Sequence, residues 1–277
     1  MKKVLIFGGA RTGTTTLSHC LRQIAYEAKD GSIANPVIDE PLNHPMRKPR
    51  LHENNGYNII KCFEEAKLLH KFVVSGDDVK CVVSRLTAGE LYRVLDVLFE
   101  KYDCIKHVHD TIFQMNNKLL FDYAVDNNIK VLYLYRRDLF SICLSKCMST
   151  QIARWHTLKT EDRKAVDKAT YDPIEITKLQ SMYTRFNNIK DVYTKYLKSK
   201  NVDYYNLCYE DFLHPDNDIE SRICTFKIIL SYIDWPYIET DPILKALDPS
   251  TKQYTDKHYD KIPNIKEIYE WRDNNCE

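Results

Sequence analysis

Short apolar runs alternate along the chain with longer stretches of helical periodicity. The apolar runs, rich in β-branched and aromatic residues, predict strands over 4–8, 59–63, 79–83, 104–108, 131–135 and 202–207. Apolar positions that recur every three or four residues predict helices over 14–28, 88–101, 113–127, 139–150, 174–198 and 219–233. Thr87, with Glu90 three residues later, predicts a capping box at the start of the second helix. Strands that alternate with helices predict an α/β fold with a central, mostly parallel sheet flanked by helices.

Two segments depart from this alternation. Residues 35–49 contain four prolines, which predicts a long, rigid loop of the kind that often carries function. Residues 157–171 are polar and highly charged, which predicts a solvated, mobile connector. Neither segment has the composition of a linker between domains, so we expect residues 1–277 to form a single domain.

Charge and hydropathy exclude several classes of protein. Forty basic residues against thirty-nine acidic ones give a net charge of +1, so a global basic field for nucleic acid is absent. No segment approaches the roughly 18–20 uninterrupted apolar residues of a membrane helix. The N-terminal apolar run, 4–7, is shorter than the apolar region of about 7–15 residues in a secretory signal. We therefore expect a cytoplasmic protein with neither a nucleic-acid partner nor an integral membrane segment.

The nine cysteines are scattered, and none forms a CxxC pair. We expect them to be reduced and to act as small hydrophobic side chains. Cys143 and Cys147 share one helix face, but no histidine or cysteine pair stands nearby to complete a zinc site. His107 and His109 alternate along a predicted strand without identifiable further ligands, so no metal site is expected.

The most informative stretch is the loop that follows the first predicted strand. It reads Gly8-Gly9-Ala10-Arg11-Thr12-Gly13-Thr14-Thr15-Thr16 and runs into the first predicted helix. The glycines allow the backbone to turn its N–H groups toward a ligand, and the helix start presents unpaired N–H groups and a positive dipole end. The threonine hydroxyls and the arginine charge complete a cradle for a phosphate-like anion.

This loop differs from the Walker A pattern, GxxxxGK[ST], at one decisive position. Gly8 and Gly13 have the Walker spacing, but Thr14 stands where the lysine belongs. The nearest charge in the loop is Arg11, two residues before Gly13. The missing lysine argues against an ordinary ATPase or kinase.

Arg11-Thr12-Gly13-Thr14-Thr15 after a first strand resembles the 5′-phosphosulfate loop of the sulfotransferases that use 3′-phosphoadenosine 5′-phosphosulfate (PAPS). An arginine in place of lysine is common in the carbohydrate and bacterial branches of that family. The resemblance implies the P-loop-NTPase-like sulfotransferase fold, with residues 11–16 around the 5′-phosphosulfate of the donor. The product would be 3′,5′-adenosine bisphosphate, and no metal would be required.

A second stretch matches the 3′-phosphate motif of the same family, a strand ending in arginine followed by a serine eight residues later. Here the predicted strand 131–135 leads to Arg137, and Ser145 lies eight residues on. Ser145 would sit about two turns into the next helix, so both side chains could converge on one phosphate. Leu139 replaces a proline that the family carries after Arg-Asp, a departure also seen in some branches.

Weaker matches follow in the order that the family has them. Residues 209–212 (Tyr-Glu-Asp-Phe) resemble a mainly structural Tyr-Glu-Asp-Leu motif. Lys252 and Gln253 lie in a segment similar to the late loop that folds over the nucleotide, and they would contact the 3′-phosphate or the loop ends. Only the first two motifs are specific.

Sulfuryl transfer needs a base for the acceptor hydroxyl, and the proline-rich segment offers candidates. Glu40-Pro41-Leu42 resembles a Glu-Pro-aromatic stretch of the carbohydrate and bacterial branches, in which the glutamate can act as base. We therefore expect Glu40 as the base, with His44 and then Asp39 as alternatives, while Arg11 stabilises the leaving phosphate oxygen. A glutamate that works near neutral pH needs a raised pKa. Lys61, in a predicted strand, could also face the sulfate.

Two other functions remain open at this point: a P-loop nucleotide kinase or NTPase, and a catalytically silent relative that only binds the nucleotide. Retention of Arg11, Thr14, Thr15, Arg137 and Ser145 argues against the silent relative. The acceptor could be a carbohydrate, a lipid or a small metabolite, and neither its identity nor the oligomeric state can be read from the sequence.

Overall fold

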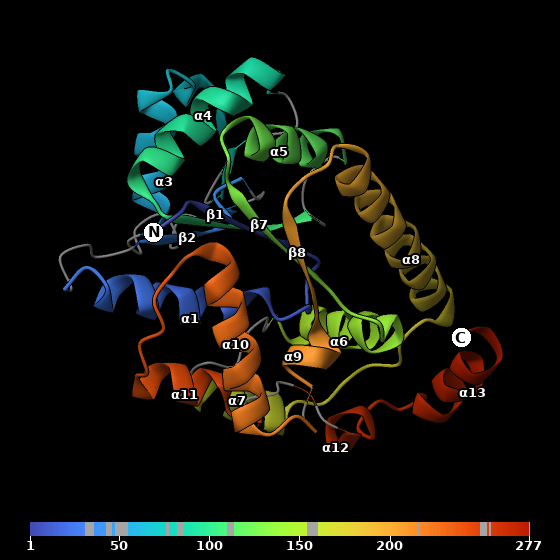
Figure 1. The fold of residues 1–277 in the computed structure, drawn as a ribbon. Helices are drawn as coiled ribbons and strands as arrows, with labels where there is room; N and C mark the ends of the chain where they lie inside the picture. Colours follow the sequence, from blue (N-terminus) through green and yellow to red (C-terminus); the bar gives the residue numbers. More distant parts are fainter. Residues whose placement is uncertain are drawn as a thin grey trace.

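The computed structural model describes residues 1–30, 36–42, 46–47, 55–75, 78–81, 86–109, 114–153, 160–214, 216–249, 254 and 256–276. Its central sheet has five strands in the order β2-β6-β1-β7-β8, and every neighbouring pair is parallel. The strands are β1 (Val4–Gly8), β2 (Val37–Asp39), β6 (Cys104–Val108), β7 (Lys130–Tyr135) and β8 (Tyr204–Cys208). The predicted α/β class with a mostly parallel sheet is confirmed (Figure 1).

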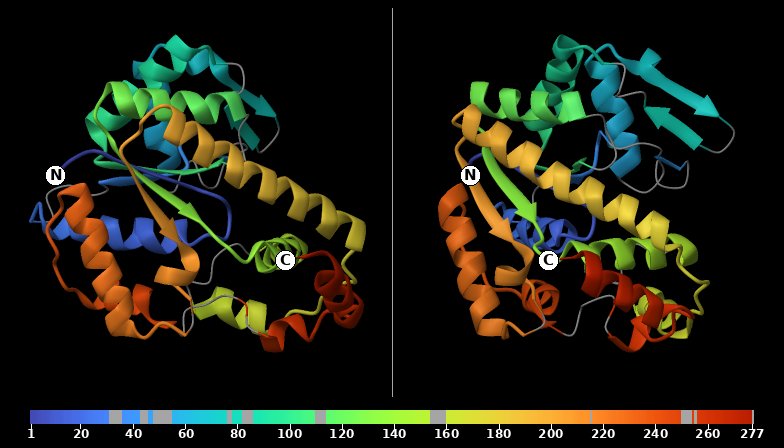
Figure 2. Two further views of the ribbon diagram at one scale, coloured as in Figure 1. Left: turned by 45° about the vertical axis from the view of Figure 1, so that its right-hand side comes forward. Right: turned by 90° about the vertical axis from the view of Figure 1, so that its right-hand side faces the viewer.

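Helices cover both faces of this sheet, as parallel sheets require. The helices between β1 and β7 are α1 (Thr14–Glu27), α3 (Asn55–Glu65), α4 (Ala88–Lys101) and α5 (Gln114–Asp126), with a short 3₁₀ turn, η1, at Leu69–Lys71. The later helices are α6 (Leu139–Ile152), α7 (Thr160–Lys168), α8 (Ile176–Ser199), α9 (Tyr209–Phe212), α10 (Ile219–Ile233), α11 (Asp241–Leu247), α12 (Asp256–Tyr259) and α13 (Ile265–Asn275). Figure 2 shows α8 running beside the sheet toward α6 and the C-terminal helices.

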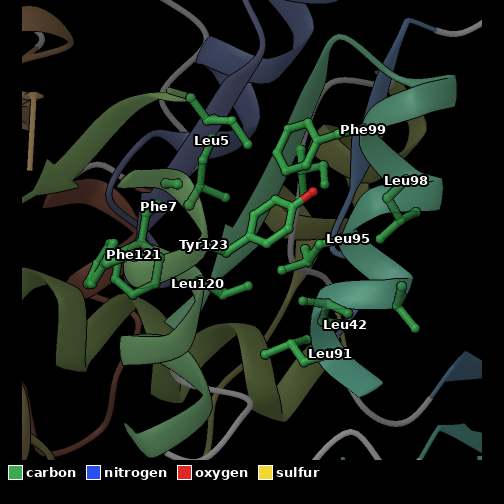
Figure 3. Packing of buried hydrophobic residues seen from close by; sticks show 14 of the residues in the cluster. Leu5, Phe7, Leu42, Leu91, Leu95, Leu98, Phe99, Leu120, Phe121 and Tyr123 are labelled. Carbon is green, nitrogen blue, oxygen red and sulfur yellow. The ribbon is translucent and has the colours of Figure 1, made fainter. Parts of the chain in front are cut away.

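Alternation of side chains along the strands divides the core between the two faces. On β1, Leu5 and Phe7 belong to the cluster with α4, α5 and α8, whereas Val4 and Ile6 belong to the cluster with α1, α10 and α11. Figure 3 shows Phe121 of α5 beside Phe7, and the ring of Tyr123 of α5 close to Phe99 and Leu95 of α4. A third cluster joins α6, α8 and the C-terminal helices. The carboxyl ends of β1, β6 and β7 lie at one edge between these clusters.

A second, antiparallel sheet of three short strands has the order β3-β5-β4: β3 (Met46–Arg47), β4 (Phe72–Ser75) and β5 (Asp78–Cys81). In Figure 2 the paired strands β4 and β5 project on the side of the molecule that carries α3 and α4. The predicted strand 79–83 therefore overlaps β5 of this small sheet and is not a strand of the central sheet.

Several sequence expectations need correction. The predicted strand 59–63 is wrong, because these residues lie inside α3, with Cys62 and Phe63 buried and Lys61 exposed. The proline-rich segment 35–49 is not loop throughout, since β2 and β3 lie in it. The charged segment 157–171 contains α7 and is not a simple connector.

The other predicted elements are confirmed to within two residues at each end. The capping box at α4 is present, with Glu90 N donating to Thr87 Oγ1 (3.3 Å) and Thr87 N donating to Glu90 Oε2 (2.9 Å). Eight of the cysteines carry free thiols, and six of these eight are buried. Among the helices in the described part of the chain, none is long and apolar enough to cross a membrane.

Candidate functional site

The loop that joins β1 to α1 lies at the carboxyl edge of the sheet, between β6 and β7. Arg11 (φ 68°) and Gly13 (φ 87°) both take left-handed backbone, which turns successive N–H groups to one side of the chain. A Cβ on Gly13 would lie 2.5 Å from Leu213 Cδ1, and a Cβ on Gly8 would lie 2.8 Å from the carbonyl oxygen of Leu134. Glycine is therefore required at Gly8 by the close approach of backbone and at Gly13 by the positive φ.

The threonines of the loop differ in what they do. Thr12 is buried and donates its hydroxyl to the carbonyl oxygen of Gly9 (2.8 Å), which holds the loop closed on itself. Thr14 is buried at the first turn of α1, and Thr15 and Thr16 keep partial exposure. Thr15 Oγ1 accepts a hydrogen bond from Lys106 Nζ at 3.1 Å. The loop thus combines a fixed backbone with a hydroxyl that is already engaged with a cation.

Arg11 connects the loop to the second sequence motif. Its Nε donates to Ser145 Oγ at 2.9 Å, and its guanidinium lies 5.8 Å from the ring centroid of Tyr254. Ser145 is buried in α6, and Tyr254 comes from the C-terminal segment predicted to fold over the nucleotide. Burial lowers the pKa of Arg11 below its usual range, and the nearby charge of Arg136 lowers it further. The arginine remains charged, because the guanidinium pKa starts far above neutral pH.

Arg136 is a second guanidinium at the mouth of the loop. It is only 7% exposed, and it lies 4.5 Å from the ring centroid of Tyr209. Its Nε is 3.4 Å from Glu210 Oε1 and its Nη2 is 3.6 Å from Asp138 Oδ2. Two guanidiniums that repel each other across a partly buried site are typical of a place that binds an anion between them.

Arg137 points elsewhere. Its side chain is 55% exposed and pairs with Asp211, with Nη2 2.6 Å from Oδ1 and Nη1 3.3 Å from Oδ2. Among the contacts of the described residues, none joins Arg137 to Ser145, so the structure does not bring the two halves of the 3′-phosphate motif together. Instead it brings Ser145 to Arg11.

The helical turn α9, at the Tyr-Glu-Asp-Phe motif, holds the chain at Arg136 and Arg137 in place. Glu210 accepts hydrogen bonds from the backbone N–H groups of Arg137 (2.9 Å) and Asp138 (3.2 Å) at the start of α6. Although burial acts to raise the pKa of Glu210, bonds from Cys208 and these N–H groups lower it. The mainly structural role that the sequence indicated for this motif agrees with these contacts.

On the other side of the loop, the buried Lys106 forms an ion pair with the partly exposed Glu40. Lys106 lies on β6, is 2% exposed, and places Nζ 2.9 Å from Glu40 Oε1 and 3.9 Å from Asp39 Oδ1. Glu40 follows β2 with left-handed backbone (φ 53°), and its N–H donates to the carbonyl oxygen of Lys106 at 2.7 Å. Because Lys106 also bonds Thr15, the carboxylate of Glu40 is linked to the phosphate loop through one ammonium group.

Asp39, the third candidate base, is committed to Arg22, whose Nη2 lies 2.6 Å from Asp39 Oδ2. Burial acts to raise the pKa of Asp39, but Lys106 and Arg22 together lower it. A lowered pKa makes Asp39 a weaker base than an ordinary carboxylate. The other candidate base, His44, and the two candidate nucleotide contacts, Lys252 and Gln253, lie outside the described residues.

The sequence reading missed two cations of this site, Lys106 and Arg136. The sequence contained a signal for Lys106, because a lysine within an apolar strand is unusual. The same reasoning singled out Lys61. Lys61 is exposed on α3, apart from the site, because its segment is helical. For Arg136 the signal was the Arg-Arg pair at a strand end, where one side chain turns inward and the next outward.

Metal ligands are not gathered in the described part of the chain, where no group of three or more His, Cys, Asp and Glu side chains could hold a metal ion. His107 is fully buried, and its Nε2 lies 2.8 Å from Asn117 Oδ1. Asn117 in turn donates to the carbonyl oxygen of His109 (3.1 Å) and to Tyr193 Oη (2.6 Å). These contacts position the end of β6 beside the loop.

Comparison with known proteins adds little to this geometry. No protein-family model and no curated protein matches the chain. Among solved structures, the chain is similar to the sulfotransferase domain of the olefin synthase of Synechococcus PCC 7002, with 12% identity and a TM-score of 0.35 over 100% of this chain and 96% of that one. This likeness is too weak to carry a conclusion about function, which therefore has to be argued from the chain's own residues.

Proposed function

We propose that this protein is a sulfotransferase that moves a sulfuryl group from PAPS to a hydroxyl of a small-molecule, lipid or carbohydrate acceptor. The observation that carries the proposal is the hydrogen bond from Arg11 to Ser145. It joins Arg11 of the first motif to Ser145 of the second, 134 residues apart in the chain. A phosphate loop tied directly to the helix after β7 gives one nucleotide two anchoring points.

Three cations support an anionic donor in this loop. Arg11 and Arg136 lie on one side, and Lys106 reaches Thr15 from the other. Their charges oppose the negative charge that spreads over the equatorial and leaving oxygens during in-line transfer. Lys106 thus supplies, from a neighbouring strand, a cation that the loop lacks at Thr14.

In the proposed reaction the acceptor oxygen attacks sulfur, and the bond between sulfur and the 5′-phosphate oxygen of the donor breaks. The acceptor proton passes to Glu40, and the bisphosphate leaves with the electron pair of the broken bond. Glu40 is placed for this role because its carboxylate lies 2.9 Å from Lys106 Nζ, and Lys106 also bonds Thr15 of the phosphate loop. His44 stays an alternative, and His109, at the end of β6, is a further one that the structure adds.

For the 3′-phosphate, the proposal keeps Arg137 and Ser145, with Lys252 and Gln253 from the late segment. Arg137 would have to exchange Asp211 for the phosphate. Because both partners are largely exposed, this exchange costs little, since water and salt screen such surface pairs.

The test is a transfer assay with PAPS carrying radioactive sulfur and a mixed panel of hydroxyl acceptors, without magnesium. We expect label in an acceptor and formation of the bisphosphate in equal amounts. A parallel reaction uses ATP labelled at its terminal phosphate, with magnesium. Label transferred only from ATP would contradict the proposal in favour of a nucleotide kinase.

A further inference from the structure

The ring of Tyr254 lies over the guanidinium group of Arg11, the arginine of the phosphate loop. The guanidinium carbon is 5.8 Å from the ring centroid, a distance at which an aromatic face attracts a cation. Tyr254 is only 2% exposed, so the ring belongs to the interior of the protein. Arg11 Nε also donates to Ser145 Oγ of α6 at 2.9 Å. Two elements that are far apart in the sequence therefore hold the side chain of Arg11.

The ring of Tyr254 is itself fixed by two buried neighbours. Its Oη lies 3.2 Å from Ser149 Oγ, one helical turn after Ser145 in α6. The imidazole ring of His258 packs against it nearly at right angles (83°), with 6.0 Å between the ring centroids. Both Ser149 and His258 are buried. Because the ring is held at its hydroxyl and by a second ring, it can hold a guanidinium at one place.

His258 connects this tyrosine to α7. Its Nε2 lies 2.9 Å from Asp167 Oδ1, and Lys257 Nζ lies 3.6 Å from the same oxygen atom. Lys261 donates to the backbone carbonyl oxygen of Asp167. Asp167 thus binds three side chains of the segment that follows Tyr254. A continuous series of contacts runs from α7, through two aromatic rings, to the arginine of the phosphate loop.

Arg11 needs such support because it is a flexible side chain beside another cation. The pKa of Arg11 is lowered by burial and then by the charge of Arg136, and the repulsion between the two cations acts to move the guanidinium away. An arginine also loses rotamer freedom when it binds an anion. A cation that is already held in place spends less free energy on orientation when charge develops on the donor.

We propose that Tyr254 is a positioning residue of the donor site, which holds Arg11 against α6, and that Asp167 acts on this site through His258 and Tyr254. The inference rests on the proposed function, because it takes Arg11 as a ligand of the donor. It adds α7 to the elements that determine donor affinity. In this account the tyrosine, the histidine and the aspartate influence the donor only through Arg11.

The first experiment is calorimetric titration with 3′,5′-adenosine bisphosphate, without magnesium. We expect Tyr254→Leu to weaken binding about tenfold, the effect of losing a buried contact between a cation and an aromatic ring. Tyr254→Phe keeps the ring and should bind within about threefold of the wild type. Asp167→Ala should weaken binding by about threefold, the lower part of the same range. The control is Asp260→Ala, at an exposed carboxylate just after α12, which should bind as the wild type does.

Two further readouts separate positioning from a merely structural role. In an Arg11→Met background, Tyr254→Leu should cause no additional loss of affinity, because the tyrosine acts through the arginine. The second readout needs no nucleotide: the NMR signal of the Arg11 Nε–H group, identified by its absence in Arg11→Met. This signal should shift and exchange faster with water in Tyr254→Leu, and should stay near its wild-type position in Tyr254→Phe.

Wild-type affinity in Tyr254→Leu, or an additional loss of the same size in the Arg11→Met background, would overturn the inference and leave the donor site intact. The thermal midpoint of unfolding shows which variants fold. If Tyr254→Leu does not fold, equal binding by Asp167→Ala and Asp260→Ala would overturn the inference. Failure of the wild type to bind the bisphosphate would overturn the proposed function, whereas the NMR signal would still test whether Tyr254 holds Arg11.

Discussion

Replacing Glu40 with glutamine is expected to lower turnover about a hundredfold, within the range that a positioned general base contributes. The amide keeps the size of the side chain and can still accept a hydrogen bond from Lys106, but it cannot take the acceptor proton. Affinity for the bisphosphate should stay close to that of the wild type, because Lys106, and not Glu40, is the group that bonds Thr15 of the loop. Turnover is measured with labelled PAPS and affinity by calorimetry.

Three further variants assign the base. Asp39→Asn is the matched control, because Asp39 is the neighbouring carboxylate and is committed to Arg22. His44→Gln and His109→Gln test the two histidine alternatives. Wild-type turnover in Glu40→Gln, with a large loss in one histidine variant, would move the base to that histidine and leave the donor site as described.

Replacing Lys106 with methionine is expected to lower kcat/KM by about 10²–10³, the range found when a preorganised charge at a transition state is removed. Lys106 is buried, bonds Thr15 of the loop and pairs with Glu40, so its loss removes one of the cations around the leaving group. Lys106→Arg, which keeps the charge, should restore part of the activity. Lys101→Met, at a surface lysine that pairs with Glu65, is the control.

The thermal midpoint of unfolding separates catalysis from stability for Lys106→Met. Loss of one partner of a partly buried ion pair destabilises proteins, because the remaining charge loses a favourable contact. Asp39 keeps Arg22, but Glu40 loses its cation, so a lower midpoint is expected. If the variant folds and its kcat/KM equals that of the wild type, Lys106 has no part in the reaction.

The fold class followed from the sequence because its strongest elements are locally consistent. Residues 4–8, 104–108 and 131–135 are compact apolar runs between helices, and they are buried strands of the parallel sheet. Residues 59–63 failed because a short apolar run is compatible with a buried helix face as well. Their wider window, 55–65, places Ile59, Cys62 and Phe63 on one helical face.

The site was predicted in part. The residues that were missed are those whose place in the site depends on the direction in which the side chain points. Spacing along the chain selected the loop and Ser145, and the resemblance of Glu40-Pro41-Leu42 to a family motif selected Glu40; of these, the structure brings Arg11 of the loop to Ser145 in α6. Spacing could not tell which of two adjacent arginines turns inward, and the structure buries Arg136 and exposes Arg137. Nor could it show that Arg11 reaches α6, which depends on the order of β1 and β7 in the sheet.

The central claim is that the loop and the start of α6 bind a nucleotide that carries a 3′-phosphate. It is tested most directly by calorimetric titration of the wild-type protein with 3′,5′-adenosine bisphosphate and with ADP, both without magnesium. We predict tight binding of the bisphosphate and binding of ADP weaker by at least about tenfold, because charge-assisted hydrogen bonds contribute about 1.5–3 kcal/mol each. Equal binding of the two nucleotides, or binding that requires magnesium, would contradict the account and favour an NTPase.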